Sequence, residues 1–419
     1  MTDRWRWFVG IDWGSEVHAI CLVDHEGIMV EERTIAHEAT AVHAWIDELL
    51  TRVGDAPDTI AVAIETPRHL LVETLLEYGL AVFAINPKQL DRFRDRFTVA
   101  GAKDDRLDAR VLATSVRTDR HAFRRVRRDD PIVIELREYS RLVENIDHEH
   151  RRLANQLREQ LVRIVPGWLT LCAGADEPWF WALLETAMTP TGPRRVSTAR
   201  LARLLKTHHI RRWTATEVAD VVHARGFVAS DGLTPAVHGH IALLLPRLGL
   251  LRSQRLTCEA RLDVLLARLS ESSSDDPRRH RDAVILRSLP GVGRLVSATM
   301  LAEAAQALAE RDYGTLRSYA GVAPVTERSG KRFHVVKFRR ACHPRLRQAL
   351  YYWSQRSLAL DPRTRAYYRA LRQRGHGHAR ALRSVADRWL RILIAMLRTG
   401  TIYDDKRFRP AIEEAIQIA

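Results

Sequence analysis

The chain has 419 residues. A single hydrophobic core usually supports fewer residues than this, so we expect two or three domains. Lys and Arg outnumber Asp and Glu by 66 to 51, and the net charge of +15 indicates a polyanionic partner or a membrane surface. No run of 18 uncharged apolar residues occurs and no signal-peptide pattern is present, so we expect a soluble cytoplasmic protein without membrane contact. The four cysteines form no CxxC pair, which argues against a zinc ribbon or a disulfide framework.

The N-terminal third predicts an α/β domain. Three short strands come first, followed by helices that alternate with strands. The predicted elements are strands 8–12, 17–23 and 28–35, helix 39–52, strand 59–64, helix 69–78, strand 81–85 and a helix from Asp105. Three antiparallel strands followed by alternating helices and parallel strands is the element order of a ribonuclease-H-like α/β domain.

The middle of the chain predicts two long helices. Residues 132–164 contain neither Pro nor Gly, and their apolar side chains recur on one helical face, which predicts a coiled coil used for dimerisation. A second long helix is expected from Arg247 to Ser270, with Pro246 in its first turn, running antiparallel to the first. The segment 166–246 between them is interpreted as a helical insertion. The apolar stripe of the first helix consists of Leu136, Leu142, Ile146, Leu153, Leu157 and Leu161.

The C-terminal part is basic and mainly helical. A Pro290–Gly293 turn precedes a helix predicted at 295–310; such glycines can hold a phosphate, but a plain tight turn is the favoured interpretation. Between Arg328 and Arg383, sixteen Lys or Arg residues face a single acid, and tyrosines are interleaved with them. A like-charge run is usually a solvated face, yet this excess favours nucleic-acid phosphates. The candidate nucleic-acid-binding residues are Arg328, Lys331, Arg332, Lys337, Arg339 and Arg340.

Four carboxylates form the candidate metal site. Asp12 and Glu65 each end a predicted strand, and Asp105 and Asp108 are spaced to share one face of the next helix. A buried carboxylate is unfavourable unless it is paired or bound to metal, and Mg²⁺ (or Mn²⁺) prefers carboxylate oxygens. The alternative is that the acids are turn formers or helix caps, as Asp104 or Asp105 could be. Their combination at active-site positions of one topology favours the metal site.

Seven segments, in order, carry a resemblance to a known family. They are Val9-Gly10-Ile11-Asp12, Ile64-Glu65-Thr66, Ile85-Asn86-Pro87, 103–109, Ser288-Leu289-Pro290-Gly291-Val292-Gly293, Tyr319-Ala320-Gly321-Val322-Ala323-Pro324 and Arg328-Ser329-Gly330. With them the chain resembles the RuvC-like (DEDD) transposases and recombinases of certain insertion sequences, which are related to Piv/MooV DNA invertases and include members guided by a bridge RNA. Two departures stand out: Thr66-Pro67 replaces the usual Gly and aromatic after the acid, and 166–246 has no counterpart.

The resemblance implies a chemistry for these residues. Asp12, Glu65, Asp105 and Asp108 would be the metal-binding catalytic tetrad, and Ser329 the nucleophile that forms a covalent phosphoserine intermediate. Judged from the residues alone, a Ser-Gly in a basic loop is usually a turn, although the neighbouring cations could bind the scissile phosphate. The implied partners are donor and target DNA, a structured guide RNA and further copies of the chain in a dimer or tetramer, near the nucleoid of a prokaryotic cell.

Three domains are expected on this basis. Residues 1–125 would be the RuvC-like catalytic domain, 126–278 a helical coiled-coil hairpin with the insertion, and 279–419 a basic transposase domain that carries the serine. The expected function is recombination of a mobile element's DNA. Two alternatives stay open: a structure-specific nuclease of the Holliday-junction type, which needs no serine nucleophile, and a non-catalytic nucleic-acid-binding protein in which the acids are structural.

Overall fold

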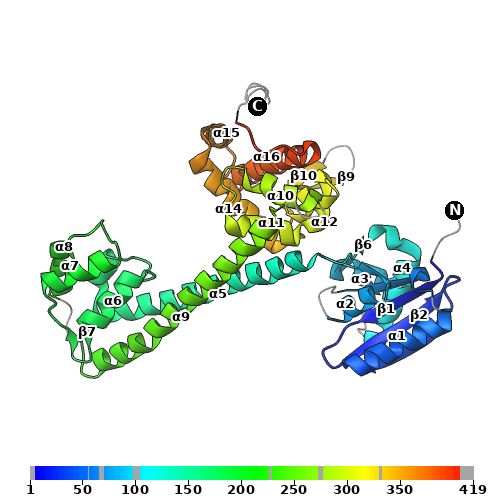
Figure 1. Ribbon diagram of the computed structural model, residues 1–419, viewed down its shortest axis with the longest axis horizontal. Helices are drawn as coiled ribbons and strands as arrows, with labels where there is room; N and C mark the ends of the chain where they lie inside the picture. The colour runs from blue at the N-terminus through cyan, green and yellow to red at the C-terminus, as the bar shows by residue number, and fades with distance from the viewer. Residues whose placement is uncertain are drawn as a thin grey trace. The chain divides into compact units, whose positions relative to one another are not determined.

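The computed structural model describes residues 5–54, 56–65, 70–97, 104–225, 229–271, 277–329 and 333–405; for 277–281, 326–329 and 333–336 it describes the backbone alone. The chain separates into two compact units, Met1–Asp130 and Pro131–Ala419. Figure 1 draws both, and each is described by itself. None of the helices in the described ranges is long and apolar enough to cross a membrane.

Unit 1 is a mixed α/β domain built on one sheet of order β3-β2-β1-β4-β5-β6. The first three strands are antiparallel, and β1, β4 and β5 are parallel, which confirms the predicted element order. The sequence did not predict the polar helix α3, the two-residue strand β6 or the short 3-10 helices η1 and η2. The elements are β1 (Trp7–Asp12), β2 (Val17–Asp24), β3 (Met29–Ala36), α1 (Ala39–Val53), η1 (Pro57–Thr59), β4 (Ile60–Ile64), α2 (Leu70–Glu77), β5 (Ala81–Ala84), α3 (Pro87–Arg94), α4 (Asp105–Asp119), η2 (Arg120–Ala122) and β6 (Arg124–Arg125).

The two faces of this sheet bury separate cores. Alternate residues of β1 and β4, such as Val9 and Val62, pack with α1 and α2, while Phe8 and Ala63 pack with α4. Helix α4 lies directly on β1, because a Cβ at Gly10 would stand 1.9 Å from the carbonyl oxygen of Ala109. Only glycine permits this approach, and it fixes α4 against the strand that ends at Asp12.

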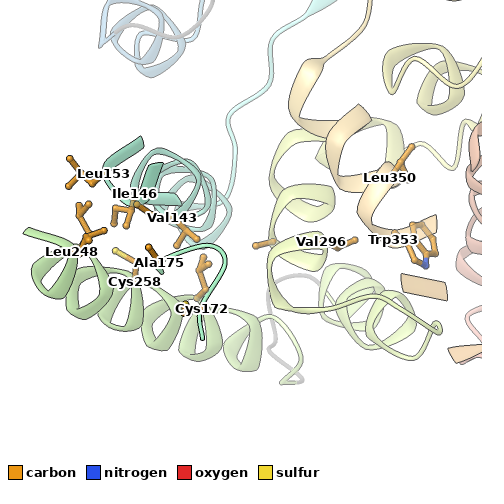
Figure 2. Packing of buried hydrophobic residues seen from close by; sticks show 14 of the residues in the cluster. Val143, Ile146, Leu153, Cys172, Ala175, Leu248, Cys258, Val296, Leu350 and Trp353 are labelled. Carbon is orange, nitrogen blue, oxygen red and sulfur yellow. The ribbon is translucent and has the colours of Figure 1, made fainter. Parts of the chain in front are cut away.

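Unit 2 begins with a helical hairpin. Helices α5 (Pro131–Ile164) and α9 (Leu233–Arg268) run along each other, and Figure 2 shows Val143 and Ile146 of α5 beside Leu248 and Cys258 of α9. Most of the α5 stripe is therefore buried inside the chain, so the expectation that it forms the dimer surface is wrong; its covering partner is α9. Leu142, which was placed in the stripe, is 44% exposed.

The second hairpin helix starts earlier than predicted. Helix α9 begins at Leu233, and Pro246 lies inside it rather than in its first turn. A proline in a helix interior costs about 3 kcal/mol. The helix continues because Leu244 and Leu248, on either side, are buried against α5, while the proline faces solvent.

The segment between α5 and α9 forms a small helical subdomain at the far end of the hairpin (Figure 1). Its consecutive aromatic residues Trp179 and Phe180 are fully buried and join the hairpin core, so this segment packs as part of unit 2. Its elements are η3 (Pro166–Thr170), α6 (Pro178–Ala187), β7 (Met188–Thr189), β8 (Gly192–Pro193), α7 (Thr198–Thr207) and α8 (Ala215–His223).

The rest of unit 2 is mostly helical, as expected, with one two-stranded hairpin. The helix predicted at 295–310 is interrupted at Ala304 and forms α11 and α12. The preceding turn packs on α14, since a Cβ at Gly291 (φ +85°) would lie 2.8 Å from the Ser357 nitrogen, which supports the plain-turn interpretation. The elements are α10 (Pro277–Arg287), α11 (Arg294–Glu303), α12 (Ala305–Ala309), α13 (Tyr313–Tyr319), β9 (Val325–Ser329), β10 (Phe333–Lys337), α14 (Pro344–Leu360), α15 (Pro362–Gln373) and α16 (His378–Thr399).

Candidate functional site

Two of the predicted acids lie at one edge of the sheet. Asp12 is the last residue of β1 and Glu65 follows the last residue of β4, and these parallel neighbours pair with Ile11 opposite Ile64. Because side chains alternate along a strand, Asp12 shares a face with Phe8, and Glu65 shares it with Ala63. That is the face covered by α4. Both carboxylates are half-buried there.

Helix α4 brings the other two acids to the same face. Asp104 is its N-cap and accepts a hydrogen bond from the Arg106 nitrogen at 3.2 Å, so the capping role considered for it is confirmed. Asp105 is the first helical residue and is exposed. Asp108 is only 2% exposed. The three acids of this turn thus differ in environment, and Asp108 is the one held inside the fold.

Arg94 of α3 is the partner of Asp108, and the sequence did not predict it. Its Nε lies 2.6 Å from Asp108 Oδ1 and its Nη2 lies 2.8 Å from Oδ2, a bidentate pair. Hydrogen bonding to Asp108 raises the pKa of the guanidinium above its ordinary value. A second acid, Asp91, accepts from Nη1 at 3.0 Å. The buried charge of Asp108 is therefore compensated by a cation from the neighbouring helix.

The donor set of these four acids fits a hard divalent cation, because it consists of carboxylate oxygens alone. In the described part of the chain, no three of these acids have ligand oxygens that all lie within 4.8 Å of one another. Among the described residues, the group of acids, cysteines and histidines whose ligand atoms all lie within 4.8 Å of one another is Cys172, Asp176 and Glu177. Glu177 there accepts hydrogen bonds from Arg212 at 2.5 Å and from Trp179 at 3.0 Å, so that group forms a hydrogen-bonded loop of the hairpin subdomain.

The candidate nucleophile belongs to unit 2, whereas the acids belong to unit 1. Ser329 is the last residue of β9 and pairs with Phe333 across the hairpin. The side chains of Ser329 and Arg328 lie outside the described part of the structure, as do Lys331 and Arg332 altogether. The backbone places the serine at the end of a strand beside the hairpin connection.

The candidate nucleic-acid-binding residues after the hairpin are not equivalent. Lys337 and Arg340 are exposed, whereas Arg339 is half-buried and donates to the Ala323 carbonyl at 3.2 Å. Phe338, between them in sequence, is 42% exposed, and the guanidinium of Arg383 lies 4.8 Å from its ring centroid. An exposed aromatic ring beside exposed cations suits both stacking and phosphate contact.

Other arginines of the basic strip have structural partners. Arg345 bonds to Glu144 and lies 3.3 Å from Glu303 Oε1, and Arg365 donates to the carbonyl oxygen of Leu358 at 2.7 Å. Arg363 pairs with Asp405 at 2.8 Å. The strip therefore contains arginines that hold α14 and α15 in place as well as cations that are exposed on the surface.

Glu303 is a buried acid that no sequence pattern marks. It is the last residue of α11 and its side chain is only 4% exposed. Arg141 of α5 contacts both its oxygens, at 3.0 and 3.2 Å, and the side chain of His343, the N-cap residue of α14, lies 3.5 Å away. Burial raises the pKa of Glu303, but the hydrogen bonds from Arg141 and the surrounding cations lower it by a larger amount. The net pKa of Glu303 is therefore below the ordinary glutamate value of 4.5. This contact links the hairpin to the C-terminal helices.

Fold and site together define a class of protein. It has a mixed α/β unit with acids at two strand ends and in the first turn of a helix, followed by a mostly helical and basic unit. Comparisons with known proteins agree with this class. A family model described as a transposase, the DEDD type of the IS110 group, matches residues 9–166. A second, described as "Transposase IS116/IS110/IS902 family", matches residues 283–369.

Individual relatives cover nearly the whole chain. The proposed transposase of the IS117 mini-circle in Streptomyces coelicolor is 34% identical over 97% of this chain and 98% of its own. An uncharacterized 43.6 kDa protein of insertion element IS110 from the same species is 27% identical over 95% and 96%. The proposed transposase y4uE of Sinorhizobium fredii is 46% identical, over 52% of this chain and 61% of its own. The chain belongs to the IS110/IS116/IS902 family of insertion-sequence transposases, enzymes that cut and rejoin DNA.

Proposed function

We propose that this transposase recombines the DNA of its element through a divalent-metal site on a RuvC-like domain and a serine nucleophile. The observation that supports the proposal is in unit 1: Asp12 and Glu65 end adjacent parallel strands on the face covered by α4, whose first turn carries Asp105 and Asp108. Active sites of open α/β sheets lie at the carboxyl ends of the strands, where these acids are. The strand order β3-β2-β1-β4-β5 supports the ribonuclease-H-like assignment.

The four acids would hold Mg²⁺ or Mn²⁺. A bound divalent cation supplies charge stabilisation for the reacting phosphate oxygens. The chain itself orients the ligands: β1 and β4 fix Asp12 and Glu65 side by side, and Arg94 fixes the carboxylate plane of Asp108. Each Asp108 oxygen keeps a second lone pair beside its hydrogen bond from Arg94, and this lone pair could bind the metal.

Ser329 would attack the scissile phosphorus. Its Oγ forms the new P–O bond, the hydroxyl proton passes to solvent or a base, and the bond from phosphorus to the departing DNA oxygen breaks as that oxygen takes up a proton. The DNA stays joined to the serine as a phosphodiester, so the bond energy is kept for resealing to a different strand. Arg328, Lys331 and Arg332, next to Ser329 in sequence, are the proposed phosphate-binding groups.

A nuclease of the same fold is the second candidate. Its supporting observation is that the acids belong to unit 1 and the serine to unit 2, so the carboxylates alone could direct water to a phosphate. A nuclease would release a free DNA end, whereas the recombinase would carry a DNA–protein adduct. The adduct is therefore the property that separates the two candidates.

The assignment extends to partners and domains. Residues 1–125 act as the catalytic domain, 126–278 as the hairpin with its insertion, and 279–419 as the basic domain that contacts donor and target DNA. A guide RNA from the element is proposed by resemblance, and the assembly is a dimer or tetramer. Sequencing the nucleic acid that copurifies with the protein tests the guide: one short, defined RNA from the element's flank supports it, and host fragments of random sequence argue against it.

The catalytic assignment is tested by strand exchange on DNA that carries the element's two ends. Asp12→Asn, Glu65→Gln, Asp105→Asn and Asp108→Asn should each lower exchange by a factor of about 100 or more, as expected when a group acts on the reacting phosphate. DNA binding should be largely kept. The matched control is Asp104→Asn, which retains a capping side chain. Normal exchange by Asp12→Asn would remove the metal site from the mechanism.

A further inference from the structure

Phe338 is an exposed aromatic residue whose ring two arginines contact. It directly follows β10, and 42% of its surface is exposed. The guanidinium of Arg383, on α16, lies 4.8 Å from the ring centroid, and that of Arg347, on α14, lies 5.4 Å from it. Because two separate helices contact the ring, its position is fixed, while a large part of its surface stays open to a further planar group.

The positive charge of these two arginines is not neutralised within the part of the chain that the structure describes. Neither guanidinium forms an ion pair with a carboxylate there. Burial lowers the pKa of Arg383, and the charge of Arg380 lowers it further. Cations that are held close together without an acid attract an anion.

A second ring in unit 2 shows how the chain compensates such a cluster inside its own fold. The guanidinium groups of Arg317 and Arg391 lie 5.8 and 5.6 Å from the ring centroid of Tyr313. Here Asp387 accepts hydrogen bonds from Arg317 and from the Tyr313 hydroxyl, each at 2.6 Å. Tyr313 is also half-buried. As far as the structure describes it, the cluster around Phe338 has neither the acid nor the burial, so internal packing does not account for it.

A nucleotide combines the two groups that such a cluster binds. Its base is a planar ring that stacks on an aromatic side chain, and its phosphate is an anion that guanidinium groups bind. In an intact duplex the neighbouring base pairs cover both faces of each base, so the nucleotide has to come from an unpaired strand. The DNA that a transposase cuts and rejoins passes through such a state, because its strands separate before they join new partners.

We propose that Phe338, Arg347 and Arg383 hold one nucleotide of an unpaired DNA strand, with the base stacked on the ring and a phosphate bound by the guanidinium groups. This is a binding site and takes no part in the reaction. Because Phe333 pairs with Ser329, five residues at about 3.4 Å each place Phe338 about 17 Å further along the hairpin. The inference rests on the action of the family on DNA, and it needs neither the metal site nor the serine nucleophile.

Neighbouring side chains extend this site along a strand. Lys337 and Arg340, close to Phe338 in sequence, are both exposed. Tyr351 lies one turn after Arg347 on the same face of α14 and is 37% exposed, so it offers a second ring. A strand that stacks one base on Phe338 therefore finds partners for the phosphates and bases of its next nucleotides.

The first test compares two duplexes of the element's end by fluorescence anisotropy without Mg²⁺, so that no strand is cut. One duplex is fully paired, and the other has a short gap that leaves the opposite strand unpaired. Phe338→Leu should weaken binding of the gapped duplex by a factor of about 10 or more, because a stacking ring is lost. Binding of the paired duplex should stay the same. An equal loss on both duplexes, or no loss on either, would overturn the proposal.

Two further variants separate stacking from a loss of structure. Phe338→Trp should keep the affinity for the gapped duplex, because an indole ring also stacks on a base. Phe97→Leu is the matched control, the same substitution at a phenylalanine of unit 1 that is 38% exposed, and it should leave the affinity unchanged. If Phe338→Trp lost as much affinity as Phe338→Leu, the ring would not act by stacking.

The response to salt distinguishes the two arginines from the ring. Arg347→Gln and Arg383→Gln should each lower the slope of log affinity against log salt for the gapped duplex by about 0.7, the value for one phosphate contact on a single strand. Phe338→Leu should leave this slope unchanged, because stacking releases no counterions. An unchanged slope in both arginine variants would refute the phosphate contact.

Photocrosslinking locates the contact directly. 5-Iodouracil in the unpaired stretch joins, on irradiation, to an aromatic side chain that is stacked on it, and mass spectrometry of the peptides identifies the residue. We expect the adduct on Phe338 with the gapped duplex and none with the paired duplex. The experiment uses Ser329→Ala, so its outcome does not depend on the proposed nucleophile. An adduct on other aromatic residues alone, or one that forms only with an RNA strand of the same sequence, would overturn the proposal.

Discussion

Arg94 donates hydrogen bonds to both carboxylate oxygens of Asp108. Asp108 is therefore either a metal ligand or the acid of a structural ion pair, and a variant of Arg94 separates these two roles. Arg94→Ala leaves a carboxylate that is 2% exposed without its cation, which should destabilise unit 1 by about 3–5 kcal/mol. If Asp108 binds metal, added Mg²⁺ should restore part of this loss, because the ion replaces the guanidinium. Urea unfolding followed by circular dichroism, with and without Mg²⁺ at constant ionic strength, measures both effects.

Asp91→Ala is the control for that experiment. It removes the other acid bonded to Arg94, but Asp91 is 66% exposed, so the loss should be about 0–1 kcal/mol and insensitive to Mg²⁺. An Arg94→Ala variant with the same stability in both buffers would make Asp108 an ion-pair residue and reduce the metal site to the other acids.

For single residues, the sequence predicts the place of an acid on its strand or helix better than it predicts the residue that pairs with it. Asp12 and Glu65 could be located at strand ends because an apolar run stops at each of them, and the alternation of β1 and β4 then fixes their face. Arg94 could not be predicted, since several arginines precede Asp108 and only the packing of α3 on α4 selects one. Glu303 was missed for the same reason: nothing local marks an acid whose partners come from distant helices.

At the scale of elements, Glu303 makes the joint between α5, α11 and α14 sensitive to acid. Its folded pKa lies below 4.5, so its stabilisation is fully present above that pH and is lost as pH falls through the lower folded value. The unsubstituted chain should therefore lose stability steeply below about pH 4.5, and Glu303→Gln, less stable by about 3 kcal/mol at neutral pH, should lose it less steeply. Urea unfolding across this pH range gives the comparison.

Glu138→Gln provides the matched control, because Glu138 also bonds Arg141, at 3.0 Å, but is 63% exposed. It should follow the pH profile of the unsubstituted chain. Equal acid sensitivity of Glu303→Gln and the unsubstituted chain would show that other carboxylates set the profile.

Periodicity predicts elements well where burial is one-sided. Strands β1 to β5 and helices α1, α4 and α5 were located because apolar residues recur at the spacing of each element. The predicted start of helix α9 was too late in the chain, because a proline such as Pro246 usually lies in the first turn of a helix. Here the helix continues through the proline, because the proline faces solvent while its neighbours pack against α5. Helix α3 was missed because only Leu90 in it is buried.

At the scale of the whole molecule, the exposed cations after the β9-β10 hairpin should make nucleic-acid affinity dependent on salt. Lys337→Gln and Arg340→Gln should each reduce the slope of log affinity against log salt by roughly one, because each removes one phosphate contact. Arg339→Gln should have a smaller effect, since that guanidinium already bonds the Ala323 carbonyl. Affinities for duplex DNA of the element's ends, measured over a salt series, test this.

Arg203→Gln on α7 is the control, an exposed arginine in the hairpin subdomain and outside the strip. Its slope should stay at the value of the unsubstituted chain. Affinity that does not respond to salt would make the strip a solvated face without phosphate contacts.

The arrangement of whole helices was the least predictable feature. The apolar stripe of α5 was interpreted as a dimer surface, yet α9 of the same chain covers it. A stripe shows that a helix needs a partner, but the sequence does not say which helix provides it. Helix α9 carries buried leucines on one face and exposed apolar residues such as Leu243 and Leu250 on another, so its sequence does not show a simple amphipathic pattern.

Trapping the covalent intermediate tests recombination through Ser329. The chain is incubated with Mg²⁺ and DNA carrying the element's two ends, denatured and digested, and the peptides are analysed by mass spectrometry. We expect a peptide that carries a nucleotide on Ser329. This peptide should be absent from Ser329→Ala, which should keep its DNA affinity. Recombination at the normal rate by Ser329→Ala, with no nucleotide-bearing peptide in either protein, would contradict this expectation and leave water or a DNA hydroxyl as the attacking group.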